Sequence, residues 1–542
     1  MKLKYFFVSF LVIFLFIPKI KAKDYQKPKL VVGIVIDQMR YDYLYKFYPY
    51  YGESGFKRLM NEGSNFTFAH FNYVPTYTAP GHTSIYTGTT PYYHGIISNN
   101  WYDKITKKTI YVTDDLKENT VGSDDDEGKM SPKRLMVTTI TDQLKMATNG
   151  ASKVIGISLK DRASILPAGH MADAAYWYDS KNGKFISSTF YLKSLPKWVE
   201  KFNSQKLADN YMSKDWELSL PIKDYEIAMP DQSDYEKDVF DEGKTTFPHS
   251  FKNVKDKNKY SAMETTPYGN QILLEFAKAT LKNEKMGEGK HTDFLAISFS
   301  STDFIGHAYG PNSVEIEDTY IKLDKQIAEL LSALDKQVGK GNYIVFLTAD
   351  HGVVENNGYR EEHKLNAGGL GMKIFEDSLY TFSYRNFGSK DIIANISNNQ
   401  IFFDHDYLKS NKLNLSTVEN SYAEYIRNTF PNITEIFTRD DLSKLTPTRL
   451  TTNLILNGFN PVRSGDIAYG LQAGLFPNRM PKGTSHGTYY SYDTHVPLLF
   501  YGWHIPVQTV NKPVVIIDIA PTIADLLKIT EPDGCYGIPL IK

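Results

Sequence analysis

Short, continuous apolar runs constrain the fold of this chain more than any other feature. They are rich in Val, Ile, Leu and Phe, and they read KLVVGIVIDQMR, SKVIGISLKDR, TDFLAISFSSTDFIGH, NYIVFLTADHG and VPLLFYG. Continuous rather than alternating apolar runs are typical of strands that are buried on both faces, as in a parallel sheet. The runs therefore predict a sheet that lies inside the molecule.

Helical patterns separate several of these runs, as in NQILLEFAKATLKN and EIEDTYIKLDKQIAELLSAL. Alternation of buried strands and helices predicts an open α/β fold, with a mostly parallel sheet flanked by helices and with ligands at the carboxyl ends of the strands. Residues near 170–260 and 356–480 do not follow the alternation. We interpret both as insertions that cover or shape the site, within one catalytic domain over residues 23–542.

The first residues predict export. Lys2 and Lys4 precede an apolar run that ends at Ile17, and Ala22 offers a small residue for cleavage. This pattern is typical of a signal peptide, residues 1–22, and the run is too short to favour a spanning helix, although an uncleaved anchor is the alternative. We therefore expect a periplasmic or secreted protein.

Cys535 is the single cysteine, so an intrachain disulfide is excluded.

The balance of charged residues indicates which binding partners the chain is suited to. Lys and Arg number 61 against 62 Asp and Glu, which gives a formal net charge of -1. Such a balance predicts no nucleic-acid-binding surface and no attraction to an anionic membrane. We expect a monomer that does not associate with the membrane once the signal peptide is removed.

Acidic and imidazole side chains gather at the ends of the predicted strands. They are Asp37, Asp303, His307, Asp350, His351 and His486. Carboxylates and imidazoles in this number suffice to bind two zinc ions. Each also has an ordinary interpretation: a lone Asp after a strand caps a helix, a helical Asp/His pair is a surface contact, and an Asp-His dipeptide forms a turn. Their joint placement favours the metal site.

Thr78 is the candidate nucleophile. It lies in FNYVPTYTAPGHTSIYTG, where Pro80 suits the first turn of a helix. Thr78 would then lie just ahead of a helix start, where free N–H groups and the helix dipole favour an anion. A threonine hydroxyl attacks poorly at neutral pH unless a divalent metal lowers its pKa, and the matching electrophile is phosphorus. The alternative is that Thr78 only caps the helix.

Three polar side chains could bind the free oxygens of a phosphoryl group. Lys160 and Arg162 follow a predicted strand two residues apart, and Asn99 lies in ISNNWYD. An ammonium, a guanidinium fork and an amide all suit a phosphoryl dianion. The alternatives are a solvated Lys-Asp-Arg turn and a turn residue at Asn99.

Taken together, these motifs resemble the alkaline phosphatase superfamily over essentially the whole mature chain. The resemblance is to the PafA-type, phosphate-irrepressible periplasmic alkaline phosphatases, which are related to the nucleotide pyrophosphatase/phosphodiesterases. The motifs that carry it are VIDQMRYD, PTYTAPGHTSIYTGTTPYYHGI, NNWYD, SLKDRASILPAGH, SSTDFIGHAYGP, TADHGV, SHGTYYSYDTHVPLLFYG and IDIAPTIADLL.

The resemblance implies a role for each candidate residue. Asp303, His307 and His486 look like the ligands of one zinc ion, and Asp37, Asp350, His351 and the oxygen of Thr78 look like those of the other. It also implies that Thr78 forms a covalent phosphothreonine, and that Asn99, Lys160 and Arg162 contact the transferred phosphoryl group. The implied substrates are small-molecule phosphate monoesters over a broad range.

Two alternatives remain open at this point. A nucleotide pyrophosphatase/phosphodiesterase would present an apolar patch to the second ester group, whereas Lys160 and Arg162 add positive charge that suits a dianionic monoester. A secreted, non-catalytic metal-binding or adhesion protein on the same scaffold is the alternative of another class. A sulfatase is not favoured, because Cys535 lies in DGCYGIPLI, far from any nucleophile position.

Overall fold

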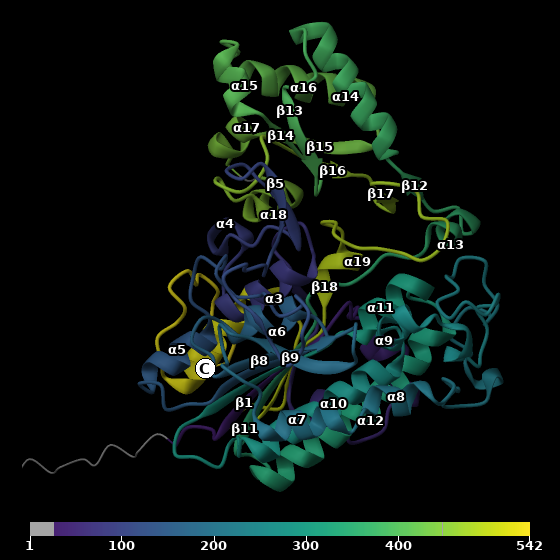
Figure 1. Ribbon diagram of the computed structural model, residues 1–542, viewed down its shortest axis with the longest axis vertical. Helices are drawn as coiled ribbons and strands as arrows, with labels where there is room; N and C mark the ends of the chain where they lie inside the picture. The colour runs from purple at the N-terminus through teal and green to yellow at the C-terminus, as the bar shows by residue number, and fades with distance from the viewer. Residues whose placement is uncertain (1–25, 447, 542) are drawn as a thin grey trace, which may run out of the picture.

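A computed structural model describes residues 26–446 and 448–541, so the predicted signal peptide lies outside the described residues. A ten-stranded sheet forms the centre of the molecule (Figure 1). Its strands, in spatial order, are β20 (Gln508–Val510), β2 (Ser64–Phe66), β19 (Leu498–Gly502), β11 (Tyr343–Thr348), β1 (Leu30–Ile36), β10 (Asp293–Phe299), β7 (Val154–Ser158), β8 (Ala174–Asp179), β9 (Lys184–Ser188) and β6 (Thr120–Val121). The predicted α/β class is confirmed.

The centre of this sheet is parallel, from β11 through β1, β10 and β7 to β8. β19 and β9 pair antiparallel with the two sides of this centre, and β2 and β20 pair parallel to each other at one outer edge. Every residue of β1 is buried. Strand β8 shows that helices lie on both faces of the sheet. Its residue Tyr176 packs on Phe276 of α10 (Pro267–Asn283), and the next residue, Trp177, clusters with Ile165 of α6 (Asp161–Ala168). Successive side chains of a strand point to opposite faces, so helices cover both sides of the sheet.

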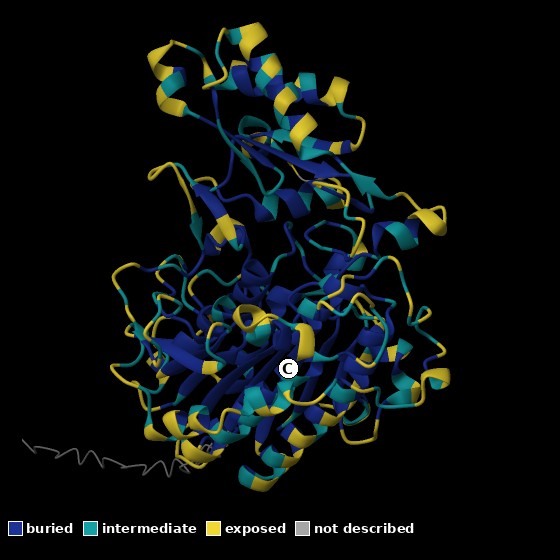
Figure 2. Ribbon diagram, turned by 45° about the vertical axis from the view of Figure 1, so that its right-hand side comes forward, coloured by how far each residue is buried: buried dark blue, intermediate teal, exposed yellow. Residues whose placement is uncertain are grey.

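The polar motifs lie where the sequence places them, at the carboxyl ends of the parallel strands. Asp37 follows β1, Lys160 follows β7 and Asp350 follows β11. Asp303 lies on α11 (Ser301–Tyr309), which begins directly after β10. Figure 2 shows the central strands as a buried layer, so these ends meet inside the molecule rather than at its surface.

The first predicted insertion, residues 170–260, is shorter in the structure. Its opening part forms β8 and β9 of the main sheet, and the sequence AAYWYD is a fully buried strand. The sequence pattern did not predict this strand, because its aromatic and acidic residues differ from the Val, Ile and Leu runs of the other central strands. The rest packs on the sheet's helices, for example through Trp216 Nε1, which donates to Asp318 Oδ2 at 2.7 Å on α12 (Val314–Gln337).

The second predicted insertion contains a separate lobe, which we call the cap and define as residues 357–480. Its antiparallel sheet has the order β13 (Ile393–Ser397), β14 (Gln400–Phe403), β16 (Ile467–Leu471) and β15 (Ile433–Thr438). With α14 (Met372–Phe387) and α16 (Leu415–Thr429), this sheet encloses its own hydrophobic core around Phe375, Tyr422 and Ile401. The cap stands at one end of the molecule, beyond α3 (Thr78–Thr87) in Figure 1.

Candidate active site

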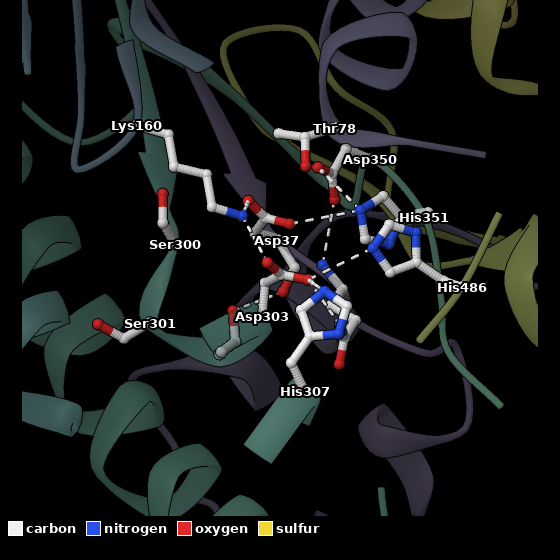
Figure 3. A network of polar contacts seen from close by, with 12 residues as sticks. Asp37, Thr78, Lys160, Ser300, Ser301, Asp303, His307, Asp350, His351 and His486 are labelled. Atoms are coloured by element: carbon white, nitrogen blue, oxygen red, sulfur yellow. Dashed lines mark hydrogen bonds and ion pairs between the residues drawn. The ribbon is translucent and has the colours of Figure 1, made fainter. Parts of the chain in front are cut away.

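The side chains predicted as metal ligands converge on one place (Figure 3). They come from separate segments: Asp37 after β1, Asp303 and His307 on α11, Asp350 and His351 after β11, and His486 in the loop before α19 (Ser491–Thr494). Their potential ligand atoms form two groups, Asp303 with His307 and His486, and Asp37 with Asp303 and His351, each within 4.8 Å. Asp303 therefore lies between the two groups, at their shared edge.

Asp350 joins the second group through His351, whose Nε2 lies 3.5 Å from Asp350 Oδ2 and 3.5 Å from Asp37 Oδ1. Gln38 braces the cluster, since its backbone N–H donates to Asp350 Oδ1 at 3.1 Å and its Nε2 donates to Asp303 Oδ1 at 2.6 Å. The sequence reasoning missed Gln38, although it directly follows Asp37.

Each candidate histidine has one ring nitrogen held by a backbone carbonyl. His307 Nδ1 lies 2.8 Å from Thr484 O, His351 Nδ1 lies 3.0 Å from Gly352 O, and His486 Nδ1 lies 2.8 Å from Thr76 O. A carbonyl can only accept a hydrogen bond, so Nδ1 carries the proton and Nε2 presents its lone pair to the cluster. This is how a second partner fixes a metal-binding imidazole.

Orphaned polar atoms at the cluster fit divalent cations. Asp37 Oδ1, Asp350 Oδ2 and His351 Nε2 are buried without a hydrogen-bond partner. Burial lowers the pKa of His351 to about 3, so its imidazole is neutral and able to coordinate. Buried carboxylates and imidazoles without partners are costly unless a cation satisfies them, so the donor set suits metal ions such as zinc.

Thr78 is the first residue of α3 and is 2% exposed. Tyr77 occupies the N-cap position and no side chain caps this helix, so the alternative of Thr78 as an N-cap does not hold. The hydroxyl of Thr78 points toward Asp350 (Figure 3). His82 fixes this turn, because its Nδ1 lies 2.9 Å from Thr78 O and 3.4 Å from Asp350 Oδ2. The structure thus places an alcohol beside the metal-binding cluster.

Asn99 reaches the same helix start. Its Oδ1 accepts a hydrogen bond from the backbone N–H of Ala79 at 2.9 Å, next to Thr78. An amide whose oxygen is engaged in this way has its NH₂ group left to donate elsewhere. Asn99 therefore lies beside the candidate nucleophile.

Lys160 takes a position that the sequence did not specify. Its Nζ lies 2.6 Å from Asp37 Oδ2 and 2.6 Å from Asp303 Oδ2, so it bridges carboxylates of the cluster. Burial opposes its charge, but Asp303 and Asp37 outweigh that penalty and raise the pKa of Lys160. The ammonium is therefore a fixed positive charge at the centre of the site.

Arg162 is held from the side by Tyr111, a residue that the sequence reasoning also missed. Arg162 Nη1 donates to the Tyr111 hydroxyl at 3.0 Å, and that hydroxyl donates to Asp161 Oδ1 at 2.7 Å. Arg162 Nε is buried and has no partner among the described residues. Tyr111 ends β5 (Lys108–Tyr111) and pairs with Asn100 of β4 (Asn100–Asp103), so one hairpin adjoins both Asn99 and Arg162.

Comparisons with known proteins show the family to which this chain belongs. The family of type I phosphodiesterases/nucleotide pyrophosphatases matches residues 31–495. Alkaline phosphatase PhoV of Synechococcus elongatus is 45% identical over 96% of this chain and 94% of its own length. Alkaline phosphatase PafA of Elizabethkingia meningoseptica is 42% identical, over 96% of this chain and 95% of its own length.

Solved structures extend the comparison. The crystal structure of wild-type PafA has a TM-score of 0.91 and covers 95% of this chain and 98% of its own, at 42% identity. Human ectonucleotide pyrophosphatase/phosphodiesterase 5 has a TM-score of 0.51 at 16% identity, over 92% of this chain and 95% of its own, and shares the fold alone. Among the described residues, none of the helices combines the length and apolar character that crossing a membrane requires.

Proposed function

Because the chain belongs to the type I phosphodiesterase/nucleotide pyrophosphatase family and is a PafA-like alkaline phosphatase, we propose that it hydrolyses phosphate monoesters with two zinc ions and a covalent intermediate on Thr78. The observation that carries this proposal is the convergence of the carboxylates and imidazoles on the Thr78 hydroxyl at the start of α3. A helix start presents free backbone N–H groups to an anion at the same point.

The proposed zinc ligands are Asp303, His307 and His486 for one ion and Asp37, Asp350 and His351, with the Thr78 oxygen, for the other. When bound, zinc lowers the pKa of an oxygen ligand and neutralises charge on the leaving oxygen. The protein's own part is to fix the tautomer of each imidazole, because the carbonyl that accepts from Nδ1 leaves the lone pair of the neutral ring on Nε2.

The remaining residues orient the phosphoryl group. Thr78 supplies the attacking oxygen, and the amide of Asn99 donates to a non-bridging oxygen beside it. Arg162, held by Tyr111, supplies a guanidinium with a free Nε. Donors that are already positioned where negative charge develops stabilise a transition state without reorganisation.

The charges in the site favour a dianionic monoester over a diester. Lys160 is buried at 5% exposure among the carboxylates, and Arg162 lies two residues away. A monoester carries one more negative oxygen than a diester, so it gains more from two fixed cations. We further propose export to the periplasm or beyond, on the signal-peptide pattern of residues 1–22, and action as a monomer.

The test compares the purified wild type with Thr78→Ala on p-nitrophenyl phosphate, bis-p-nitrophenyl phosphate and p-nitrophenyl sulfate, with zinc measured by mass spectrometry. We expect kcat/KM to be highest for the monoester, two zinc ions per chain, and phosphate on Thr78 in acid-quenched wild type. Preference for the diester would overturn the monoesterase proposal. Phosphate on another residue, or none, would overturn the proposed nucleophile.

A further inference from the structure

The cap reaches the site through the turn that joins β13 and β14. Ser397 pairs with Gln400, so Asn398 and Asn399 form the two-residue loop of a β-hairpin. Both have left-handed backbones, with φ of 53° and 56°, which asparagine tolerates better than most residues. The turn therefore favours a residue such as Asn or Gly at both positions. The turn itself does not require the carboxamide of Asn398, which can bond to groups outside the hairpin.

That side chain bonds to the backbone and hydroxyl groups on either side of Asn99. Asn398 Oδ1 accepts a hydrogen bond from Ser98 Oγ at 3.1 Å, and Asn398 Nδ2 donates to the carbonyl of Asn100 at 2.7 Å. One carboxamide thus uses its acceptor before Asn99 and its donor after it. A bifunctional amide bridging both neighbours restricts the rotation of the peptide groups between them.

Asn99 itself is held at two further points. Its carbonyl accepts from Val112 N at 3.0 Å, and its side-chain Oδ1 accepts from Ala79 N at 2.9 Å. These bonds hold the two oxygen atoms of Asn99, and the pairing of Asn100 with Tyr111 holds the chain after it. The Asn398 bridge adds a restraint that spans Asn99 from Ser98 to Asn100, from a residue 300 positions away from Ser98 in the chain.

We propose that Asn398 is a positioning residue of the phosphatase: from the cap, its carboxamide fixes the backbone around Asn99 and so aims the Asn99 NH₂ group at the transferred phosphoryl oxygen. The inference rests on the proposed function, because it takes the role of Asn99 from it. Asn398 has no hydrogen bond to the metal-binding cluster among the described residues, so the proposal assigns its effect to Asn99.

The loop would survive the loss of this bridge. Arg463 of the cap donates to the carbonyl of Gly95 at 2.6 Å and lies over the Trp101 ring at 5.4 Å. These contacts anchor both ends of the segment that carries Asn99. Removing the Asn398 side chain should therefore shift Asn99 without releasing the whole loop.

The experiment uses the zinc-loaded full chain, four single variants and the double variant Asn99→Ala/Asn398→Gly. Asn398→Gly removes the side chain but suits the left-handed backbone, and Asn398→Asp keeps the acceptor for Ser98 while losing the donor to Asn100. Asn399→Gly is the matched control, because Asn399 shares the turn and its side chain has no hydrogen bond among the described residues. Asn99→Ala supplies a background without the Asn99 amide, in which the loss of Asn398 should have no further effect if Asn398 acts by positioning that amide.

We expect Asn398→Gly to lower kcat/KM for p-nitrophenyl phosphate about tenfold, since small misplacements of a catalytic group cost that much or more. Asn398→Asp should fall between wild type and Asn398→Gly, and Asn399→Gly should match wild type. Melting temperature and zinc content should be equal in Asn398→Gly and Asn399→Gly. In the Asn99→Ala background, Asn398→Gly should change kcat/KM less than twofold.

Other results would overturn the proposal. Equal losses in the two glycine variants would assign the effect to the turn rather than to the Asn398 side chain. A further tenfold loss on top of Asn99→Ala would show that Asn398 acts elsewhere, and no loss in Asn398→Gly would remove its role. If Asn99→Ala alone keeps wild-type activity, the proposed function of Asn99 has failed, which this single variant distinguishes from a failure of Asn398.

Discussion

The main sheet and the cap sheet of this phosphatase differ in the direction in which their strands pair. The central strands of the main sheet are parallel and buried on both faces, so their carboxyl ends meet and bring Asp37, Asp303 and Asp350 together. The cap sheet is antiparallel, and its described residues, 357–446 and 448–480, contribute no group of metal-binding side chains. Parallel topology concentrates polar strand ends at one edge, whereas antiparallel topology distributes them over two.

The cap instead supports the loops that carry reacting groups. Asn457 Nδ2 donates to Asn72 O at 2.7 Å, and Val74 N donates to Leu454 O at 3.1 Å, in the loop that leads to Thr78. Asn398 bridges the residues around Asn99 in the same manner. The proposals therefore assign the chemistry to the core and orientation to the cap, so equivalent changes in the two should have very different effects.

The largest contrast should come from threonines. Thr78→Ala should lower kcat/KM on p-nitrophenyl phosphate by about 10³-fold or more, because it removes the nucleophile, while zinc content and melting temperature stay near wild type. Thr381→Ala, at an exposed position of α14 in the cap, should leave activity unchanged. Loss of zinc in Thr78→Ala would instead assign Thr78 a structural role.

The next largest contrast should come from metal removal, which should loosen the core site but not the cap. Dialysis against a chelator should abolish activity and increase amide hydrogen exchange in residues 301–310 and 349–355, because the strand-end carboxylates lose the cations that neutralise them. Peptides from β14 and β16 of the cap should exchange as before. Equal increases in both regions would show that the cap depends on the metals for its own stability.

Arginines offer a smaller contrast. Arg162→Ala should lower monoester turnover by about 10²-fold, equivalent to a few kcal/mol of transition-state stabilisation, and should affect diester turnover far less. Arg427→Ala, on the exposed face of α16, is the control in the cap and should change neither. Equal losses on monoester and diester would contradict the argument that Arg162 recognises the extra charge.

The smallest effect on activity is expected at Glu419 of the cap, whose titration should change stability alone. Glu419 of α16 is fully buried, and burial together with Asp466 raises its pKa from 4.5 to about 8. The unfolded chain releases this proton near pH 4.5 and the folded cap only near pH 8, so Glu419 lowers the stability progressively as the pH rises between those values.

Glu419→Gln removes this titration and should stabilise the protein by up to about 4 kcal/mol at pH 9 relative to its effect at pH 5, measured by urea unfolding at both pH values. Activity at saturating zinc should not change, because Glu419 lies outside the site. An effect of the same size at both pH values would show that Glu419 is not protonated in the folded cap at pH 5.

Much of the fold and the site was predictable from local sequence. Buried strands appear as continuous apolar runs, and the polar residues after them must lie at the carboxyl ends if the strands are parallel. This reasoning found the α/β fold and the candidate ligands. It failed at AAYWYD, where aromatic and acidic residues resemble a surface loop although tertiary packing buries every one of them as β8.

The sequence by itself determined which candidate residues are present and which apolar runs they follow, because the apolar pattern of a strand is a local property. Only the tertiary structure decided how they meet: Asp303 lies between both ligand groups, Lys160 bridges Asp37 and Asp303, and Asn398 of the cap turn bonds to both neighbours of Asn99 in the chain. These contacts join residues up to hundreds of positions apart, and they arise from packing rather than from any repeating pattern in the chain.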